Sequence, residues 1–553
     1  MPRTVSIGCQ DFETIRRENC FYVDKTSFIR KWWEQKDSVT LITRPRRFGK
    51  TLTMSMVEKF FSVNTVEGEN LFQGLEIWEK EEYRKLQGTY PVISLSFASI
   101  KEQNYHMARR KICQILSGLY SRYCFLLNED ILDNKEKKFF ESVSADMADV
   151  EATLAIQQMS LYLSRYYGKK VIILLDEYDT PMQEAYVNGY WEEMTSFTRS
   201  LFNAAFKTNP CLECALMTGI TRISKESIFS DLNNLEVVTV TSEKYADTFG
   251  FTEGEVFEAL KEFGLLSQKE EVKNWYDGFT FGKRTDIYNP WSILNYLDKK
   301  IVGAYWANSS SNALAGKLIQ EGNKDIKQEF ERLMRGESIC AEIDEQIVYN
   351  QLDQDEQAVW SLLLASGYLR VKSIEIRPLD FGGWVQVYEL CLTNLEVRIM
   401  FRNMIRKWFG RASSMYNDFI KALLEDNIKA MNAYMNDVAM VTFSFFDTGK
   451  NPSRTEPERF YHGFVLGIMM ELADRYLLTS NRESGFGRYD VILEPKKPEK
   501  DDAIIIEFKV QDTDDEKELL DTVKAALQQI EEKHYEATLL ERGIAKDRIR
   551  KYG

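Results

Sequence analysis

The chain of 553 residues is poor in histidine and proline, and its cysteines form no dense group. The eight cysteines are scattered along the chain, and only Cys211 and Cys214 are spaced as a possible metal or redox pair. A disulfide scaffold would need closely spaced cysteines, and a zinc site would need further cysteine or histidine ligands near this pair. The cysteine content therefore predicts a protein of a reducing compartment, the cytoplasm.

Long apolar runs are also missing from the sequence. No segment reaches the roughly 18 consecutive apolar residues of a membrane span, and residues 1–20 lack the apolar stretch of a signal peptide. We expect a soluble protein that is not secreted and has no membrane partner.

Basic residues are outnumbered, since 71 Lys and Arg face 85 Asp and Glu, for a net charge of -14. This balance excludes a basic coat over the whole surface, so any contact with nucleic acid must be local. The candidate patches are Arg44, Arg46 and Arg47, the pair Lys496-Lys497, and residues 541–553. Each of them is equally compatible with an ordinary solvated face.

The first half of the chain alternates apolar runs of strand length with amphipathic helical patterns. The apolar runs cover residues 39–44, 90–97, 171–178 and 214–220, and helical patterns cover residues 51–61 and 151–167. Buried strands that alternate with helices are typical of a parallel sheet covered on both faces. The sequence therefore predicts an α/β domain here.

The rest of the chain has two different textures. After about residue 255, helices alternate with aromatic loops, and residues 359–371 with 384–394 predict a helix, a turn and two strands, as in a winged-helix module. The last part predicts a small α/β domain, with helices over 461–478 and 524–535 and strands over 488–495 and 503–510. We thus divide the chain into residues 1–255, 256–440 and 441–553.

A stretch after the first predicted strand nearly spells a phosphate-binding loop. Gly49, Lys50 and Thr51 supply the glycine turn, the phosphate-binding lysine and the Mg²⁺-binding hydroxyl, directly before a predicted helix. Arg44 stands where the first glycine is expected, and an arginine resists a positive φ, so the loop geometry is predicted to differ. The alternative is a helix N-terminus with a chance Gly-Lys pair.

Acidic and polar residues follow two later strands of the same domain. Asp176 ends an apolar run, where its carboxylate can hold Mg²⁺, and Glu177 beside it can polarise a water molecule. Thr218 and Arg222 follow the next strand and can contact the γ-phosphate, Arg222 either within its own chain or from a neighbouring subunit. Ordinary loop contacts remain the alternative for both.

The last part of the chain carries a second set of carboxylates with a lysine. Glu507 and Lys509 are two residues apart on a predicted strand, so they should face the same side. Asp490 opens the adjoining strand and Glu483 should end the preceding helix, so both can converge on a metal ion. Oxygen ligands suit Mg²⁺ or Mn²⁺, which would activate water on a phosphodiester. A charged pair on a half-exposed strand is the alternative.

Longer motifs connect these sites to a known family. They cover residues 21–29, 44–51, 174–181, 218–235, 276–282 and 287–294. The chain resembles, over nearly its whole length, the bacterial AAA-ATPase-like proteins that carry a C-terminal PD-(D/E)XK nuclease-type domain. The resemblance implies a multidomain α/β protein with a P-loop RecA/AAA-like parallel sheet, a helical or winged-helix middle and a nuclease-like end. In that family an Arg-Pro-Arg-Arg-Phe loop is usual.

The resemblance also implies roles for individual residues. ATP would be bound by Arg46, Arg47, Phe48, Gly49, Lys50, Thr51, Asp176, Thr218 and Arg222. Metal ligands would be Thr51, Asp176, Asp490 and Glu507, and catalytic residues would be Glu177, Glu483, Asp490, Glu507 and Lys509. Gln528 and Gln529 fit the helix glutamine of the nuclease pattern. Tyr22, Asp24, Lys25 and His462 are open between a site role and a structural one.

These features together predict a metal-dependent nuclease-type protein that binds and hydrolyses ATP. Its partners would be ATP with Mg²⁺, DNA as the cleaved polymer, and possible further copies of the chain in a homo-oligomer. One alternative is an ATP-driven switch whose last domain binds nucleic acid or protein without cutting. Another is a protein that binds ATP without hydrolysing it.

Overall fold

A computed structural model describes most of the chain. The described residues are 2–63, 71–222, 229, 232–307, 313–321, 324–345, 356–378, 383–408, 413–434, 472, 475–480, 483–484, 487–488, 491–509 and 518–553. The chain folds into two compact units, each built from two stretches. They are Met1–Ser311 with Ser338–Val397, and Asn312–Glu337 with Arg398–Gly553.

The first unit is built on a parallel five-stranded sheet. Its strands are β1 Val39–Thr43, β2 Val92–Ser96, β3 Val171–Asp176, β4 Leu212–Gly219 and β5 Leu235–Val238. The strand order is β2-β3-β4-β1-β5, with parallel pairing throughout. The four predicted strands are confirmed. Their mainly apolar sequences reflect burial on both faces for β1, β3 and most of β4, whereas Ser96 of the edge strand β2 is exposed. Because β4 lies between β1 and β3, the segments after these three strands meet at one edge of the sheet.

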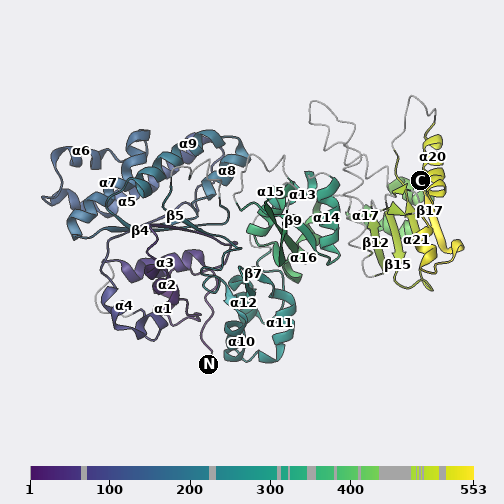
Figure 1. The fold of residues 1–553 in the computed structure, drawn as a ribbon, viewed down its shortest axis with the longest axis horizontal. Helices are drawn as coiled ribbons and strands as arrows, with labels where there is room; N and C mark the ends of the chain where they lie inside the picture. Colours follow the sequence, from purple (N-terminus) through teal and green to yellow (C-terminus); the bar gives the residue numbers. More distant parts are fainter. Residues whose placement is uncertain are drawn as a thin grey trace. The chain divides into compact units, whose positions relative to one another are not determined.

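Helices cover both faces of this sheet (Figure 1). On one face lie α1 Phe12–Arg17, α2 Ser27–Gln35, α3 Lys50–Phe61 and α4 Glu81–Leu86. On the other lie α5 Tyr105–Arg122, α6 Asn134–Ser142, α7 Asp149–Tyr167, α8 Thr180–Asn188 and α9 Trp191–Phe202. The helices predicted over residues 51–61 and 151–167 are thereby confirmed as α3 and α7.

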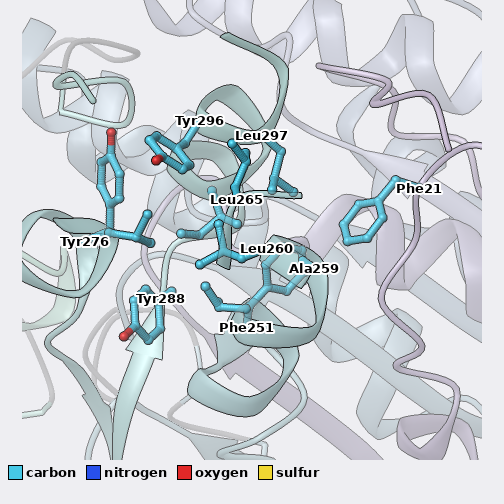
Figure 2. Packing of buried hydrophobic residues seen from close by; sticks show 12 residues of the cluster. Phe21, Phe251, Ala259, Leu260, Leu265, Tyr276, Tyr288, Tyr296 and Leu297 are labelled. Atoms are coloured by element: carbon cyan, nitrogen blue, oxygen red, sulfur yellow. The ribbon is translucent and has the colours of Figure 1, made fainter. Parts of the chain in front are cut away.

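A smaller subdomain with its own core follows in the same unit. It contains α10 Glu253–Glu262, α11 Lys269–Tyr276 and α12 Pro290–Lys299, with a sheet of β6 Phe251–Thr252, β8 Arg284–Tyr288 and β7 Phe279–Phe281. Figure 2 shows Tyr276, Tyr288 and Tyr296 packed around Leu260, with Phe21 from the N-terminal segment in the same cluster. The buried aromatic residues of this cluster are therefore core residues, and Phe279–Phe281, expected in an aromatic loop, form the strand β7.

A helix and an antiparallel sheet complete the first unit. They are β9 Ile339–Glu342, α15 Glu356–Ala365, β10 Leu369–Pro378 and β11 Trp384–Leu392, in the sheet order β10-β11-β9. The predicted helix, turn and two strands are confirmed, and a third strand joins them. Gly367 takes a positive φ of 84° in the turn between α15 and β10.

The second unit contains helices and a mixed four-stranded sheet. Its helices are α13 Ala313–Glu321, α14 Lys324–Met334, α16 Leu395–Trp408, which begins in the first unit, α17 Ser413–Leu424, α20 Leu519–Glu532 and α21 Ala537–Glu541. The sheet has β12 Tyr476–Ser480, β15 Val491–Pro495, β16 Ala503–Ile506 and β17 Ile549–Tyr552, in that order. A separate hairpin joins β13 Glu483–Ser484 to β14 Gly487–Arg488.

Two predictions for this unit were wrong in detail. The helix predicted over 461–478 does not extend to its expected end, because Tyr476–Leu478 belong to β12, while residues 461–471 lie outside the described part. The strand predicted over 503–510 ends at Ile506. The closing helix is confirmed as α20, and the three-part division of the chain stays a prediction. Among the described residues, no helix is long and apolar enough to cross a membrane.

Candidate nucleotide and nuclease sites

The loop between β1 and α3 has left-handed backbone at two positions, neither of which is Arg44. Arg47 has a φ of 64° and Gly49 a φ of 80°. Arg44 instead continues β1, since its N–H donates to the carbonyl of Gly219 at 3.1 Å. The obstacle predicted at Arg44 therefore does not arise, because the chain turns later in the loop.

The side chain of Arg44 is fully buried beneath the loop. Its Nη1 donates to the carbonyls of Thr43 at 3.0 Å and Thr239 at 2.5 Å, and its guanidinium lies 4.5 Å from the ring centre of Phe281. Burial lowers the pKa of Arg44 to about 9. Arg44 thus anchors the base of the loop to the segment after β5.

Lys50 is the first residue of α3, and its side chain is hydrogen-bonded to the start of the same loop. Its Nζ donates to the carbonyl of Arg44 at 2.8 Å and to that of Pro45 at 2.9 Å. Burial lowers the pKa of Lys50, and the nearby charges of Glu177 and Asp176 oppose this shift. The first N–H groups of α3 have no acceptor within the helix, so the N-terminus of α3 combines these donors with the Lys50 ammonium.

Asp176, at the end of β3, joins two hydroxyl groups from neighbouring elements. Thr51 Oγ1 donates to Asp176 Oδ2 at 2.7 Å, and Thr218 Oγ1, from β4, donates to Asp176 Oδ1. The structure therefore brings together three of the residues predicted from the sequence. A hydroxyl and a carboxylate in contact are the oxygen ligands that Mg²⁺ prefers beside a phosphate.

Glu177 has a strained backbone. Its φ is 51°, a region that residues with a Cβ rarely adopt. Its N–H lies 3.4 Å from Thr218 Oγ1, and its Oε2 accepts from Thr180 Oγ1 at 3.1 Å. Such strain persists where neighbouring contacts enforce it, and it concentrates at functional sites.

Asp179, which the sequence did not single out, ties the segment after β3 to the segment after β4. Its carboxylate is 1% exposed, and Oδ2 accepts from the N–H groups of Ile220 and Thr221, both at 2.9 Å. Tyr178 adds a backbone bond to the carbonyl of Thr218 at 3.0 Å and a hydroxyl bond to that of Thr221 at 2.8 Å. Glu177 is therefore held between anchored neighbours.

Other residues predicted to bind ATP have side chains that contact other residues of the chain. Phe48 is buried edge-on against Phe279, with ring centres 4.8 Å apart, and the Arg47 guanidinium lies 4.2 Å from the ring centre of Trp291. Arg222 lies near Glu345, where its charge opposes the rise in the pKa of Glu345 that burial causes. These residues shape the loop and its surroundings.

The N-terminal motif has structural partners. Asp24 accepts from the N–H of Thr26 at 2.9 Å, and the Lys25 ammonium donates to Glu255 at 2.7 Å. The hydroxyl of Tyr22 faces the sulfur of Met56 at 3.4 Å. These contacts favour the structural alternative for the motif.

In the second unit, Glu507 follows β16 and is 5% exposed. Its Oε1 accepts from Gln529 Nε2, which also donates to the hydroxyl of Tyr535 at 2.9 Å. Of the two glutamines on α20, Gln529 therefore faces the carboxylate, whereas Gln528 bonds to Glu532. Tyr535 is the member of this network that sequence reasoning missed.

The remaining nuclease candidates are placed less completely. Lys509 is exposed, and Asp490 and His462 lie outside the described residues. Glu483 lies in the short strand β13, so its prediction at the end of a helix was wrong. Val491, next to Asp490 in the chain, pairs with Ile506, next to Glu507.

Two families match the chain. The family described as Predicted AAA-ATPase (AAA-ATPase_like) matches residues 6–229, and the PD-(D/E)XK nuclease superfamily (PDDEXK_9) matches residues 456–553. The chain therefore carries an AAA-ATPase-like domain and a C-terminal domain of the PD-(D/E)XK nuclease superfamily, as the sequence motifs predicted. Domains of these two kinds generally use a nucleotide and a divalent metal ion.

A relative is found in Azotobacter chroococcum mcd 1, where it is described as an uncharacterized protein in the vnfD 5' region. It is 24% identical over 398 residues, which cover 72% of this chain and 68% of that protein. The similarity thus extends beyond either family match alone, and the description assigns no activity.

Proposed function

We propose that this chain, an AAA-ATPase-like domain joined to a PD-(D/E)XK nuclease-superfamily domain, hydrolyses ATP in its first unit and cleaves DNA with its second. The observation that supports the first half is the hydrogen-bonded chain from Thr51 through Asp176 to Thr218. It joins the start of α3 to the ends of β3 and β4, beside the buried ammonium of Lys50.

The proposed roles in hydrolysis follow from these positions. Lys50 would exchange its bonds to the loop carbonyls for oxygens of the β- and γ-phosphates. Thr51 and Asp176 would hold Mg²⁺, which neutralises the charge that develops on the phosphates. Glu177 would accept a hydrogen bond from the attacking water, and Thr218 would keep the Asp176 carboxylate in place.

ATP turnover by the full-length protein and two variants tests these roles. Lys50→Ala should lose ATP binding, because the ammonium that meets the phosphates is removed. Glu177→Gln should bind ATP with little change but turn it over at least about 100-fold more slowly, the loss typical of a removed general base. Turnover that survives Lys50→Ala at the wild-type rate would refute the proposed site.

For the second unit, we propose that Glu507 and Asp490 bind Mg²⁺ or Mn²⁺ and that Lys509 and Glu483 complete the centre. The register of β15 and β16 supports this, because the chain neighbours of Asp490 and Glu507 pair directly. The metal ion would supply an activated water and stabilise charge on the phosphate, while Gln529 orients the Glu507 carboxylate.

The switch that binds without cutting is favoured by one observation. Glu507 is 5% exposed and its Oε1 is engaged by Gln529, so a metal ion would have to displace protein contacts. Calorimetric titration of the full-length protein with Mn²⁺ separates the alternatives at this site. If the nuclease proposal holds, Mn²⁺ binds to the wild type at a site that Glu507→Gln removes. If the domain binds without cutting, the wild type and Glu507→Gln give identical Mn²⁺ titrations.

A further inference from the structure

The carbonyl of Arg46, inside the phosphate loop, is held by two side chains from far along the sequence. Trp306 Nε1 donates to it at 2.9 Å, and Asn289 Nδ2 lies 3.4 Å from the same oxygen. Both donors lie beyond residue 229, where the AAA-ATPase-like match ends. The loop therefore depends on residues outside the matched domain.

This contact determines where the next peptide N–H points. In a trans peptide the carbonyl and the following N–H point in opposite directions, and the described chain has no cis peptide bonds. Holding the Arg46 carbonyl toward Asn289 and Trp306 therefore directs the Arg47 N–H to the opposite side. The φ of 64° at Arg47 is the left-handed conformation with which consecutive N–H groups form an anion-binding concavity.

Trp306 is itself fixed in place by a buried carboxylate. Glu396 is 0% exposed, and its Oε1 accepts from the backbone N–H of Trp306 at 2.6 Å while its Oε2 accepts from Ser292 Oγ at 2.8 Å. The indole ring packs against Phe279 and Tyr368, with ring centres 5.4 and 5.7 Å away. The bond from the backbone N–H, the bond from the indole Nε1 to Arg46 and the two ring contacts together define one orientation of the indole.

We propose that Trp306 and Asn289 are positioning residues of the phosphate loop, and that Glu396 acts through Trp306. They keep the Arg46–Arg47 peptide in the orientation that binds phosphate, so the loop is formed before the nucleotide arrives. This inference rests on the proposed ATP site. It explains how Arg47, a residue with a side chain, keeps a left-handed conformation in the loop, because the two donors hold the preceding peptide in place and offset part of the strain.

Two conservative variants of the full-length protein remove only the donors. Trp306→Phe keeps an aromatic ring but deletes the N–H. Asn289→Asp keeps the cap of α12, whose N–H of Trp291 donates to Asn289 Oδ1 at 2.9 Å, but turns the donor toward Arg46 into an acceptor. Matched controls are Trp275→Phe, in the same subdomain, and Asn104→Asp, which caps α5 with a 3.0 Å bond from the N–H of Met107.

Calorimetric titration with Mg²⁺ and ATP, together with steady-state turnover and the melting temperature without nucleotide, gives the readout. Loss of one buried hydrogen bond should weaken ATP binding about 3- to 10-fold in Trp306→Phe, and more in Asn289→Asp, where two oxygens would repel. Each variant should melt within a few degrees of its control. A purely structural role would lower the melting temperature and leave the Kd unchanged.

The possible failures are distinguishable. If the wild-type protein binds ATP and both variants match their controls in Kd, the inference is overturned and the proposed site stands. If the wild-type protein does not bind ATP, the proposed site and the inference fail together. A variant that does not fold is replaced by the other, because Trp306 and Asn289 reach the same carbonyl from different elements.

Discussion

Removing the carboxylate of Asp179 should loosen the segment after β4. In Asp179→Ala the partly buried N–H of Ile220 and the buried N–H of Thr221 lose their shared acceptor, and a buried donor without a partner costs about 1 to 3 kcal/mol. We expect a total loss of roughly 3 kcal/mol in the free energy of unfolding. For a unit of this size that lowers the melting temperature by roughly 4 °C.

Asp179→Asn keeps a hydrogen-bond acceptor but removes the negative charge, so it distinguishes the two contributions. The amide oxygen can replace Oδ2, and its NH₂ group takes the position of Oδ1, so the variant should lose less than about 1 kcal/mol. Hydrogen exchange of the peptide covering residues 212–222, followed by mass spectrometry, measures the segment directly. Faster exchange is expected in Asp179→Ala and wild-type exchange in Asp179→Asn. Equal exchange in both variants would refute the argument from acceptor geometry.

Other substitutions test further parts of the structure. Burial raises the pKa of Glu396 from 4.5 to about 7, so the unfolded chain ionises first as the pH rises, and stability present below pH 4.5 is lost by pH 7. Urea unfolding from pH 5 to 8 should show the wild type losing about 2.5 kcal/mol that Glu396→Gln does not lose. Gly367→Ala should weaken ATP binding, measured by titration, because a Cβ would lie 2.8 Å from the ring of Pro45 in the loop and the φ of 84° disfavours alanine. Gly219→Ala should lower the melting temperature, because its Cβ would lie 2.7 Å from the ring of Tyr178.

The parallel sheet was predictable because its buried strands are continuous apolar runs. β5 was missed because Leu235–Val238 is short and carries a glutamate, so it has no such run. The strand that begins at Ala503 was predicted too long, because apolar sequence alone does not show where the hydrogen-bonded pairing with neighbouring strands ends. Local sequence patterns thus identified most of the strands, whereas the residues at which a strand ends depend on contacts with its neighbours in the sheet.

The candidate site was predictable where its chemistry is local. Lys50, Thr51 and Asp176 follow directly from strand ends and a helix start. The role of Arg44 depends on the position of Thr239, which is 195 residues away. The hydrogen bonds to the Arg46 carbonyl come from Asn289 and Trp306, which are 243 and 260 residues away. No pattern within a short window connects such residues, so these contacts required the structure.

The central claim, that the chain combines an ATPase with a metal-dependent nuclease, is tested most directly by incubating the full-length protein with plasmid DNA, Mg²⁺ or Mn²⁺, and ATP. Lys509→Ala and Lys50→Ala serve as paired variants in the same assay. We predict that the wild type cuts the plasmid and that Lys509→Ala abolishes cutting while its ATP turnover continues. Cutting that survives Lys509→Ala, or intact plasmid in the presence of wild-type ATP turnover, would contradict the account.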